Sequence, residues 1–176
     1  GNAVALANAL CSRASLALDV ETPEKAVAMN MEALLALGTT PADTAVLIRL
    51  YSNLGHAHGW QGALDSAVHY HLRAIDLLNI VPNDQKLAWN RMNLGVVLAD
   101  QGNYLPAIGL FQDALHFYEH ERAVYEIGAC LHYLAYCQQH VLTADRVVRN
   151  YERAIAIYDS IGHERRSMRV RMAAGR

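Results

Sequence analysis

The sequence has little of what a membrane protein, a disulfide-rich domain or a nucleic-acid-binding protein requires. No apolar run reaches the roughly eighteen residues of a membrane-spanning helix. Three cysteines among 176 residues are too few, and odd in number, for a disulfide framework, which favours free thiols and a cytoplasmic location. The formal net charge is −2, from 15 basic and 17 acidic residues, so the overall charge favours neither nucleic acid nor an anionic membrane.

Catalytic signatures are equally sparse. The sequence contains no glycine-rich phosphate loop followed by Lys and Ser or Thr, and no Gly-x-Ser-x-Gly motif. Residues 116–120 read His-x-x-Glu-His, an inverted zinc-peptidase motif, and His116 and His120 would share one face of a helix. No third ligand is evident, so a metal-dependent hydrolase is a remote alternative. We expect no enzyme activity, no bound metal and no other cofactor.

What the sequence does contain is an internal repeat. The chain is 53% hydrophobic and 18% charged, which excludes a disordered protein. Three segments align without gaps at a spacing of 40 residues: Asn53-Leu54-Gly55, Asn93-Leu94-Gly95 and Tyr133-Leu134-Ala135. Agreement in one register over three segments predicts stacked copies of a single structural unit.

The second half of each copy repeats in the same register. In each copy a small residue is followed four positions later by a larger one, and three positions after that by alanine. The three sets are Ala67, His71 and Ala74; Ala107, Phe111 and Ala114; and Val147, Tyr151 and Ala154. Ala26 and Ala33 fit the same pattern one residue out of phase. The predicted repeats are residues 2–40, 41–81, 82–121 and 122–161, with a partial fifth over 162–176.

Each repeat is predicted to form two antiparallel helices, because apolar residues recur three and four apart and no alternating strand pattern appears. The four prolines stand near predicted helix starts, at Thr22-Pro23, Thr40-Pro41, Pro82 before Asn83, and Pro106 after Asn103. The expected helices are 2–19, 23–37, 42–60, 63–79, 83–101, 104–120, 122–140, 144–160 and 164–175.

The spacing also predicts how the helices pack. Gly55 or Gly95 is expected to face Ala67 or Ala107 so that two antiparallel helices approach closely, and stacking of repeats supplies the core. His58 and His71 fall on core positions and are expected to be buried and hydrogen-bonded. Cys130 and Cys137 share one helix face and are interpreted as small buried hydrophobic residues.

The order Leu-Gly, Gly, Ala, aromatic, Ala resembles the tetratricopeptide repeat family, whose usual period is about 34 residues. The period of 40 is similar to the extended variant found in sensor regions of bacterial transcriptional activators and in polarity and transport scaffolds. His58, Leu98 and Leu142 depart from the family pattern. The resemblance implies an all-α, right-handed superhelical solenoid whose first helices line a concave groove that binds peptides or partner segments.

Helical spacing maps that groove onto a set of residues, which we call the stripe. The stripe comprises Arg13, Arg49, Asn53, His56, Trp60, Trp89, Asn93, Val96, Tyr133, Tyr136 and His140, with Asp100, Ala129, Arg169 and Ala173 at further positions. Trp and Tyr are good interface anchors, and Asn53 and Asn93 could bond a peptide backbone through both amide atoms. The alternative is that Trp89 only packs on the preceding repeat and that the Asn residues only bridge helices. The stripe lacks the lysines of family members that clamp a terminal carboxylate, so we do not expect such a clamp.

The sequence therefore predicts a non-enzymatic protein- or peptide-binding module. The alternative is a ligand- or protein-sensing segment of a larger signalling protein, such as a STAND-type bacterial transcriptional activator. The chain opens Gly-Asn-Ala and is interpreted as a piece of a longer protein. An apolar end formed by Met168, Val170 and Met172 predicts self-association, and the basic run over 164–171 is interpreted as a solvated helix face rather than a nucleic-acid site.

Overall fold

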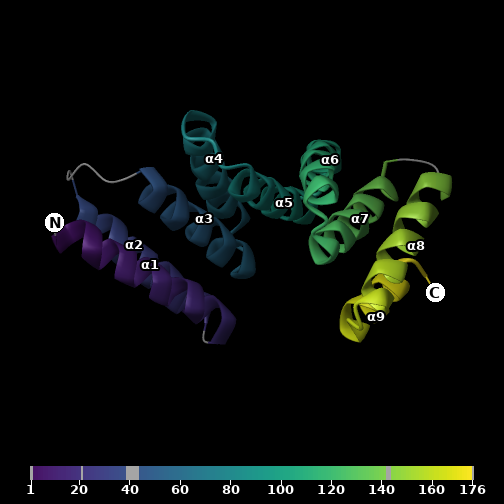
Figure 1. Cartoon of the computed structure of the whole chain (residues 1–176), viewed down its shortest axis with the longest axis horizontal. Coiled ribbons are helices and arrows are strands. Elements are labelled where there is room, and N and C mark those ends of the chain that lie inside the picture. The colour runs from purple at the N-terminus through teal and green to yellow at the C-terminus, as the bar shows by residue number, and fades with distance from the viewer. Residues whose placement is uncertain (1, 21, 39–43, 142–143, 176) are drawn as a thin grey trace. The chain divides into compact units, whose positions relative to one another are not determined.

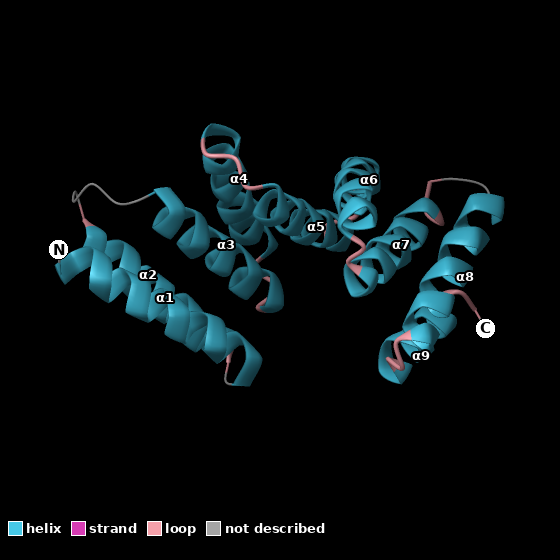
Figure 2. Ribbon diagram, in the orientation of Figure 1, coloured by secondary structure: helices cyan, strands magenta, loops and turns pink. Residues whose placement is uncertain are grey.

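The structure is a computed structural model that describes residues 2–20, 22–38, 44–141 and 144–175 (Figure 1). Within these ranges every regular element is an α-helix (Figure 2). The helices are α1 Asn2–Val20, α2 Pro23–Leu37, α3 Thr44–Trp60, α4 Leu64–Ile80, α5 Asp84–Asp100, α6 Tyr104–Glu121, α7 Val124–Gln138, α8 Ala144–Ser160 and α9 Glu164–Ala173. The predicted bounds agree with these to within two residues.

The predicted period is present in the helix starts. Helices α3, α5, α7 and α9 begin at residues 44, 84, 124 and 164, and α4, α6 and α8 begin at 64, 104 and 144. An all-α solenoid of helix pairs is therefore confirmed, while its right-handed sense stays a prediction.

The described prolines lie near helix starts, as predicted. Pro23 opens α2, and the Asn83 side chain accepts a hydrogen bond from the Lys86 backbone N–H at 2.9 Å before α5. Thr22 before α2 and Asn103 before α6 make no side-chain cap bond. The Thr40-Pro41 pair and Leu142 lie outside the described residues.

The chain divides into two compact units, Gly1–Val97 (unit 1) and Leu98–Arg176 (unit 2), and each is considered by itself. In unit 1, α1 packs on α2, α3 packs on α4, and α3 also contacts α2 and α1. In unit 2, α7 packs against α6 and α8, and α8 against α9. Each helix buries one face against its neighbours, because a single pair cannot cover its own apolar side.

The predicted core positions of the second helices are buried. One side chain per turn is inaccessible in each of them: Ala26, Asn30, Ala33, Leu37 in α2; Ala67, His71, Ala74, Leu78 in α4; Ala107, Phe111, Ala114, Tyr118 in α6; Val147, Tyr151, Ala154, Tyr158 in α8. Cys130 and Cys137 are also buried, as predicted, and burial raises the pKa of their thiols to about 12 and about 11.

Gly55 of α3 lies against the His71 ring of α4. A Cβ atom on Gly55 would lie 2.8 Å from carbons of the His71 ring, whereas a Cβ on Gly59 would lie 4.0 Å from Ala67. The glycine therefore makes room for an imidazole ring, and its predicted approach to Ala67, one turn earlier in α4, stays a prediction.

His71 is buried and hydrogen-bonded as predicted. Its Nδ1 lies 3.0 Å from Asn90 Oδ1, and Asn90 Nδ2 donates to Ser52 Oγ and to the Lys86 carbonyl, both at 2.9 Å. Burial lowers the pKa of His71 to about 4, so the ring is neutral. For His58 the predicted burial was wrong, because the ring is only half-buried; it stacks on Tyr70 at 5.5 Å between ring centres and has Gln61 as a hydrogen-bond partner.

The predicted apolar C-terminal end needs a correction. Val170 is fully buried in the core that α8 and α9 share, whereas Met168 is 64% exposed and Met172 is 76% exposed. A helix presents only one face outward, and Val170 lies on the inner face.

Among the described residues no helix is both long enough and apolar enough to cross a membrane.

Candidate functional site

Three stripe residues line one pocket in unit 1. The pocket has a volume of about 170 Å³. Its lining is Ile48, Arg49, Ser52, Asn53, Lys86, Trp89 and Asn90. The stripe included Arg49, Asn53 and Trp89, and it missed the other four. Asn90 and Ser52 belong to the hydrogen-bond network of His71, so one wall of the pocket rests on the polar core of the unit.

The pocket is positively charged, because it contains Arg49 and Lys86 but no carboxylate among its seven lining residues. Arg49 is held from α3 against α1: its guanidinium donates to Asn8 Oδ1 at 3.2 Å and to Ser12 Oγ at 3.0 Å. A guanidinium held in this way retains its charge while losing little side-chain freedom when it binds a ligand.

The amide donors of the two stripe asparagines are used inside the chain. Asn53 Nδ2 donates to Ser15 Oγ at 2.9 Å and to the Cys11 carbonyl at 3.3 Å, which ties α3 to α1. Asn93 Nδ2 donates to the Trp89 carbonyl at 2.8 Å, one turn earlier in α5. The bridging that we gave as an alternative is present for Asn53, whereas Asn93 bonds within its own helix.

The two tryptophans and His56 form an aromatic row in unit 1. The His56 ring meets Trp60 and Trp89 edge-on, each at 5.3 Å between centres, and Trp89 also meets His71 edge-on at 6.1 Å. Trp60 is 61% exposed, whereas Trp89 is half-buried. Trp89 thus packs on the preceding repeat while one side of it still lines the pocket.

The remaining stripe residues of unit 1 lie outside the pocket lining. Arg13 is exposed, and Val96 and Asn93 are half-buried.

The stripe residues of unit 2 form a separate aromatic group. His140 stacks on Tyr104 at 4.3 Å, and Tyr136 meets both rings edge-on, at 6.2 Å from Tyr104 and 5.2 Å from His140. Tyr133 stacks instead on the core residue Phe111 at 5.5 Å. The sequence did not single out Tyr104, and Ala129, placed on the stripe, is buried.

The histidine pair of the inverted zinc-peptidase motif lies on the surface of α6. His116 and His120 are both exposed, and His120 Nδ1 lies 2.9 Å from Glu121 Oε1. In the part of the chain that the structure describes, no three His, Cys, Asp or Glu side chains gather as metal ligands would.

Residues 46–120 match the family model described as tetratricopeptide repeat. Helices α7, α8 and α9 continue the 40-residue period after this segment, and the helix pair α1 and α2 precedes it. The chain therefore contains tetratricopeptide repeats over residues 46–120. A search of curated proteins gives no match.

Solved structures share the fold at low identity. BtubC (BKLC) from P. vanneervenii is 21% identical with a TM-score of 0.73, over 98% of this chain and 74% of that one. A STAND protein with a tetratricopeptide repeat sensor, PH0952 from Pyrococcus horikoshii, is 15% identical with a TM-score of 0.79, over 95% of this chain and 26% of that one. Aspartyl phosphate phosphatase F from Bacillus subtilis is 12% identical with a TM-score of 0.76, over 90% of this chain and 42% of that one. The present chain therefore spans well under half of the last two proteins, and these likenesses show the fold alone.

Proposed function

We propose that the chain is a non-enzymatic interaction module that binds a peptide or partner segment on the stripe, with the unit 1 pocket as its anchor point. The observation that carries the proposal is the convergence of Arg49, Asn53 and Trp89 on one pocket. Helical spacing alone selected these three residues, two of which lie on α3 and one on α5. Together they supply a positive charge, a hydrogen-bond acceptor and an aromatic face.

The chemistry of the pocket favours a mixed ligand. Trp89 and Ile48 offer an apolar wall, while Arg49 and Lys86 offer charged donors. A peptide that presents an apolar side chain next to a polar or acidic one would use both. The exposed Trp60 ring extends the apolar surface beyond the pocket.

The two tryptophans allow a direct test, since the chain has no others. The purified chain would be screened with a random peptide library displayed on phage, and selected peptides would be titrated while tryptophan fluorescence is recorded. In a Trp60→Phe variant the signal comes from Trp89 alone. We expect binding to change that signal, and Trp89→Ala to weaken binding at least tenfold.

The matched control is Leu72→Ala, which removes an exposed apolar side chain from α4 of the same unit. It should leave the affinity unchanged. Selected peptides that bind equally well to Trp89→Ala, Arg49→Gln and the parent chain would contradict the proposal.

A sensing role within a larger signalling protein is the second candidate. It is supported by the similarity to the sensor-bearing STAND protein, of which this chain spans 26%. The flanking sequence of the parent gene tests it: a nucleotide-binding domain joined to this segment would support it, and its absence would reject the STAND reading. A cytoplasmic location belongs to the same proposal and rests on the three free, buried thiols.

Self-association remains part of the proposal, now through Met168 and Met172 without Val170. Mass measured by light scattering over a wide concentration range should rise with concentration. A constant monomer mass would reject it.

A further inference from the structure

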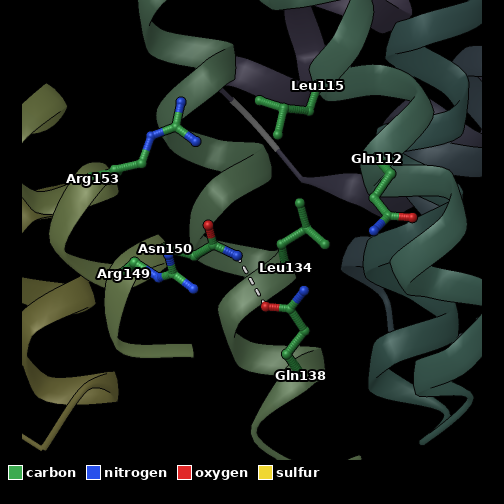
Figure 3. A pocket seen from close by; sticks show the side chains of 7 residues that line it. All are labelled: Gln112, Leu115, Leu134, Gln138, Arg149, Asn150 and Arg153. Atoms are coloured by element: carbon green, nitrogen blue, oxygen red, sulfur yellow. Dashed lines mark hydrogen bonds between the residues drawn. The ribbon is translucent and has the colours of Figure 1, made fainter. Parts of the chain in front are cut away.

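A larger pocket lies in unit 2, away from the stripe (Figure 3). It has a volume of about 380 Å³, within the range of small-ligand and side-chain sites. Helices α6 and α8 form its two sides and α7 its floor; the lining is Gln112, Leu115, Leu134, Gln138, Arg149, Asn150 and Arg153. At 3.6 residues per turn, Leu134 and Gln138 point nearly opposite to the stripe residue Tyr136 of α7.

Two amide side chains, Gln138 of the α7 floor and Asn150 of the α8 side, are bonded to each other in the pocket. Gln138 is 5% exposed, and its Oε1 accepts a hydrogen bond from Asn150 Nδ2 at 2.9 Å. Figure 3 shows that each amide turns its other polar atom away from this bond, which leaves an N–H donor on Gln138 and an oxygen acceptor on Asn150. A buried amide is stabilised when both of its polar ends are bonded. The floor therefore suits a ligand that itself carries both an N–H and a C=O, as a peptide backbone does.

The side formed by α8 is cationic. Arg149 and Arg153 are one turn apart, so they project from the same face of the helix. Arg153 Nη2 pairs with Glu119 Oε1 of α6 at 2.9 Å, and both side chains of this pair are about half exposed. Arg149 is exposed and pairs with no carboxylate in the part of the chain that the structure describes. Two guanidinium groups against one carboxylate leave the pocket with a net positive charge.

These features narrow the class of ligand. A guanidinium binds a carboxylate through two parallel hydrogen bonds. A simple anion would meet the Asn150 oxygen, which is an acceptor, and would gain nothing from Leu115 and Leu134. Nucleic acid is disfavoured because its phosphates would also meet the Asn150 oxygen, and because the chain carries a net charge of −2.

We propose that the unit 2 pocket binds an acidic side chain of an extended peptide segment, with the carboxylate on Arg149 and Arg153, the adjacent peptide group on Gln138 and Asn150, and an apolar neighbour against the leucines. This is a second binding site on a different unit and a different face of the first helices, and it does not depend on the stripe.

Two labelled peptide libraries test the proposal on the full chain. Both are acetylated and amidated with random flanking residues; one has Glu at its centre and the other has Gln. Fluorescence anisotropy should show the Glu library binding at least tenfold more tightly than the Gln library. Arg149→Gln should remove most of that difference, and Arg149→Lys should keep part of it, because an ammonium keeps the charge but not the paired hydrogen bonds.

Two controls separate this site from the rest of the molecule. Arg165→Gln removes an exposed arginine from α9 of the same unit and should leave binding unchanged. Trp89→Ala in unit 1 should also leave it unchanged, so failure of this proposal and failure of the stripe proposal are distinguishable.

Three results would overturn the inference. One is equal binding of the Glu and Gln libraries; another is equal binding to Arg149→Gln and to Arg165→Gln. The third is binding of glutarate or of an oligonucleotide as tightly as the Glu library, which would make the pocket a general anion site. Circular dichroism of each variant confirms that the helices are intact, which is expected because Arg149 is exposed.

Discussion

One repeat position is occupied by polar side chains in unit 1 and by aromatic side chains in unit 2. Asn30 in α2 and His71 in α4 stand where Phe111 stands in α6 and Tyr151 in α8, and all four are buried. His71 bonds to Asn90 across helices, whereas Phe111 stacks on Tyr133. The repeat pattern determines that this position is buried. The residue at the position determines whether its neighbours must be polar, because a buried polar atom without a hydrogen-bond partner lowers stability.

The largest loss of stability is expected for Phe111, the aromatic residue at this position in α6. Phe111→Ala should lower the free energy of unfolding by about 3–5 kcal/mol, because it removes a fully buried ring and leaves a cavity. Phe117, the only other phenylalanine, is half-buried, and Phe117→Ala should cost less than half as much. Urea unfolding measures both, and equal costs would mean that the α6 core is not packed as described.

Acid should destabilise both units. The pKa of His71 falls from 6.5 to about 4 through burial, and that of His132 in unit 2 falls to about 4 through burial and the charges of Arg166 and Arg169. The unfolded chain then binds more protons between these values, so stability is complete above pH 6.5 and is lost as the pH falls toward 4. At about 1.4 kcal/mol per pKa unit, each histidine should lower the free energy of unfolding by about 3 kcal/mol when the pH falls from above 6.5 to 4.

The measurement is the urea midpoint as a function of pH. His132→Leu should remove roughly half of the acid sensitivity and leave the part that His71 causes. A midpoint that stays constant between pH 6.5 and pH 4 would show that neither ring is buried in its neutral form.

Converting the unit 1 position to the chemistry of unit 2 tests the polar pairing. Asn90→Leu leaves His71 Nδ1 without its partner and should cost about 1–3 kcal/mol. The double variant His71→Phe with Asn90→Leu replaces both partners by apolar side chains and should regain part of that loss. Simple addition of the two single effects in the unfolding free energy would contradict a coupled pair.

Gly55 tests the close approach that the imidazole requires. Gly55→Ala should destabilise by about 1–3 kcal/mol, because the new Cβ would lie within 2.9 Å of three atoms of the His71 ring. Gly109 in α6 has no atom within 4 Å of an added Cβ, so Gly109→Ala should stabilise by up to about 1 kcal/mol. Thermal unfolding should show opposite signs, and equal signs would refute the tight contact.

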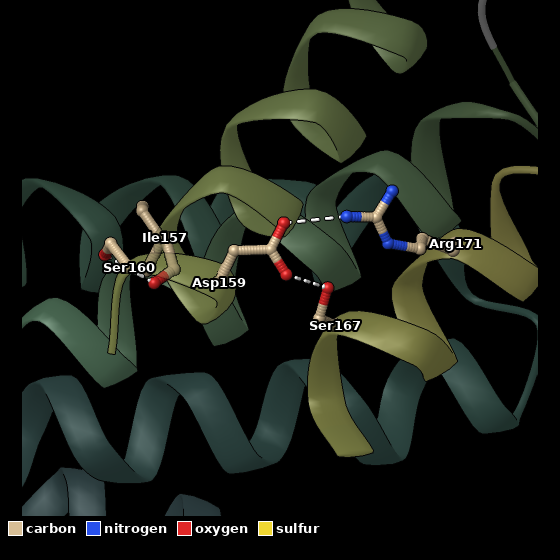
Figure 4. Close-up of polar contacts among 5 residues, drawn as sticks. All are labelled: Ile157, Asp159, Ser160, Ser167 and Arg171. Carbon is tan, nitrogen blue, oxygen red and sulfur yellow. Dashed lines mark hydrogen bonds and ion pairs between the residues drawn. The ribbon is translucent and has the colours of Figure 1, made fainter. Parts of the chain in front are cut away.

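The smallest effect is expected where α9 is attached to α8. Asp159 accepts hydrogen bonds from Ser167 Oγ at 2.5 Å and from Arg171 Nη2 at 2.7 Å (Figure 4). The Asp159–Arg171 pair is about half exposed, so Asp159→Asn should cost less than about 1 kcal/mol. Hydrogen exchange of α9 amides measures this, and a loss of all protection would show that the pair does more than we expect.

The sequence predicted the fold well because periodicity reports burial directly. The 40-residue spacing of Leu54, Leu94 and Leu134 located the first helices, and the spacing of Ala74, Ala114 and Ala154 located the second helices. The candidate sites were predicted less completely. Lys86 and Asn90 follow no repeated pattern in the sequence, and nothing distinguished Gln138 or Asn150 from other surface amides until α6, α7 and α8 were placed together.

By itself the sequence determined the number, length and order of the helices and which face of each is buried, since these depend on contacts within one or two turns. Only the tertiary structure decided that Asn53 uses its amide nitrogen on α1, that Gly55 makes room for the His71 ring, and that two separate pockets are bordered by arginines. These features arise between helices some twenty to forty residues apart, where a shift of one turn changes every partner without altering the repeat pattern.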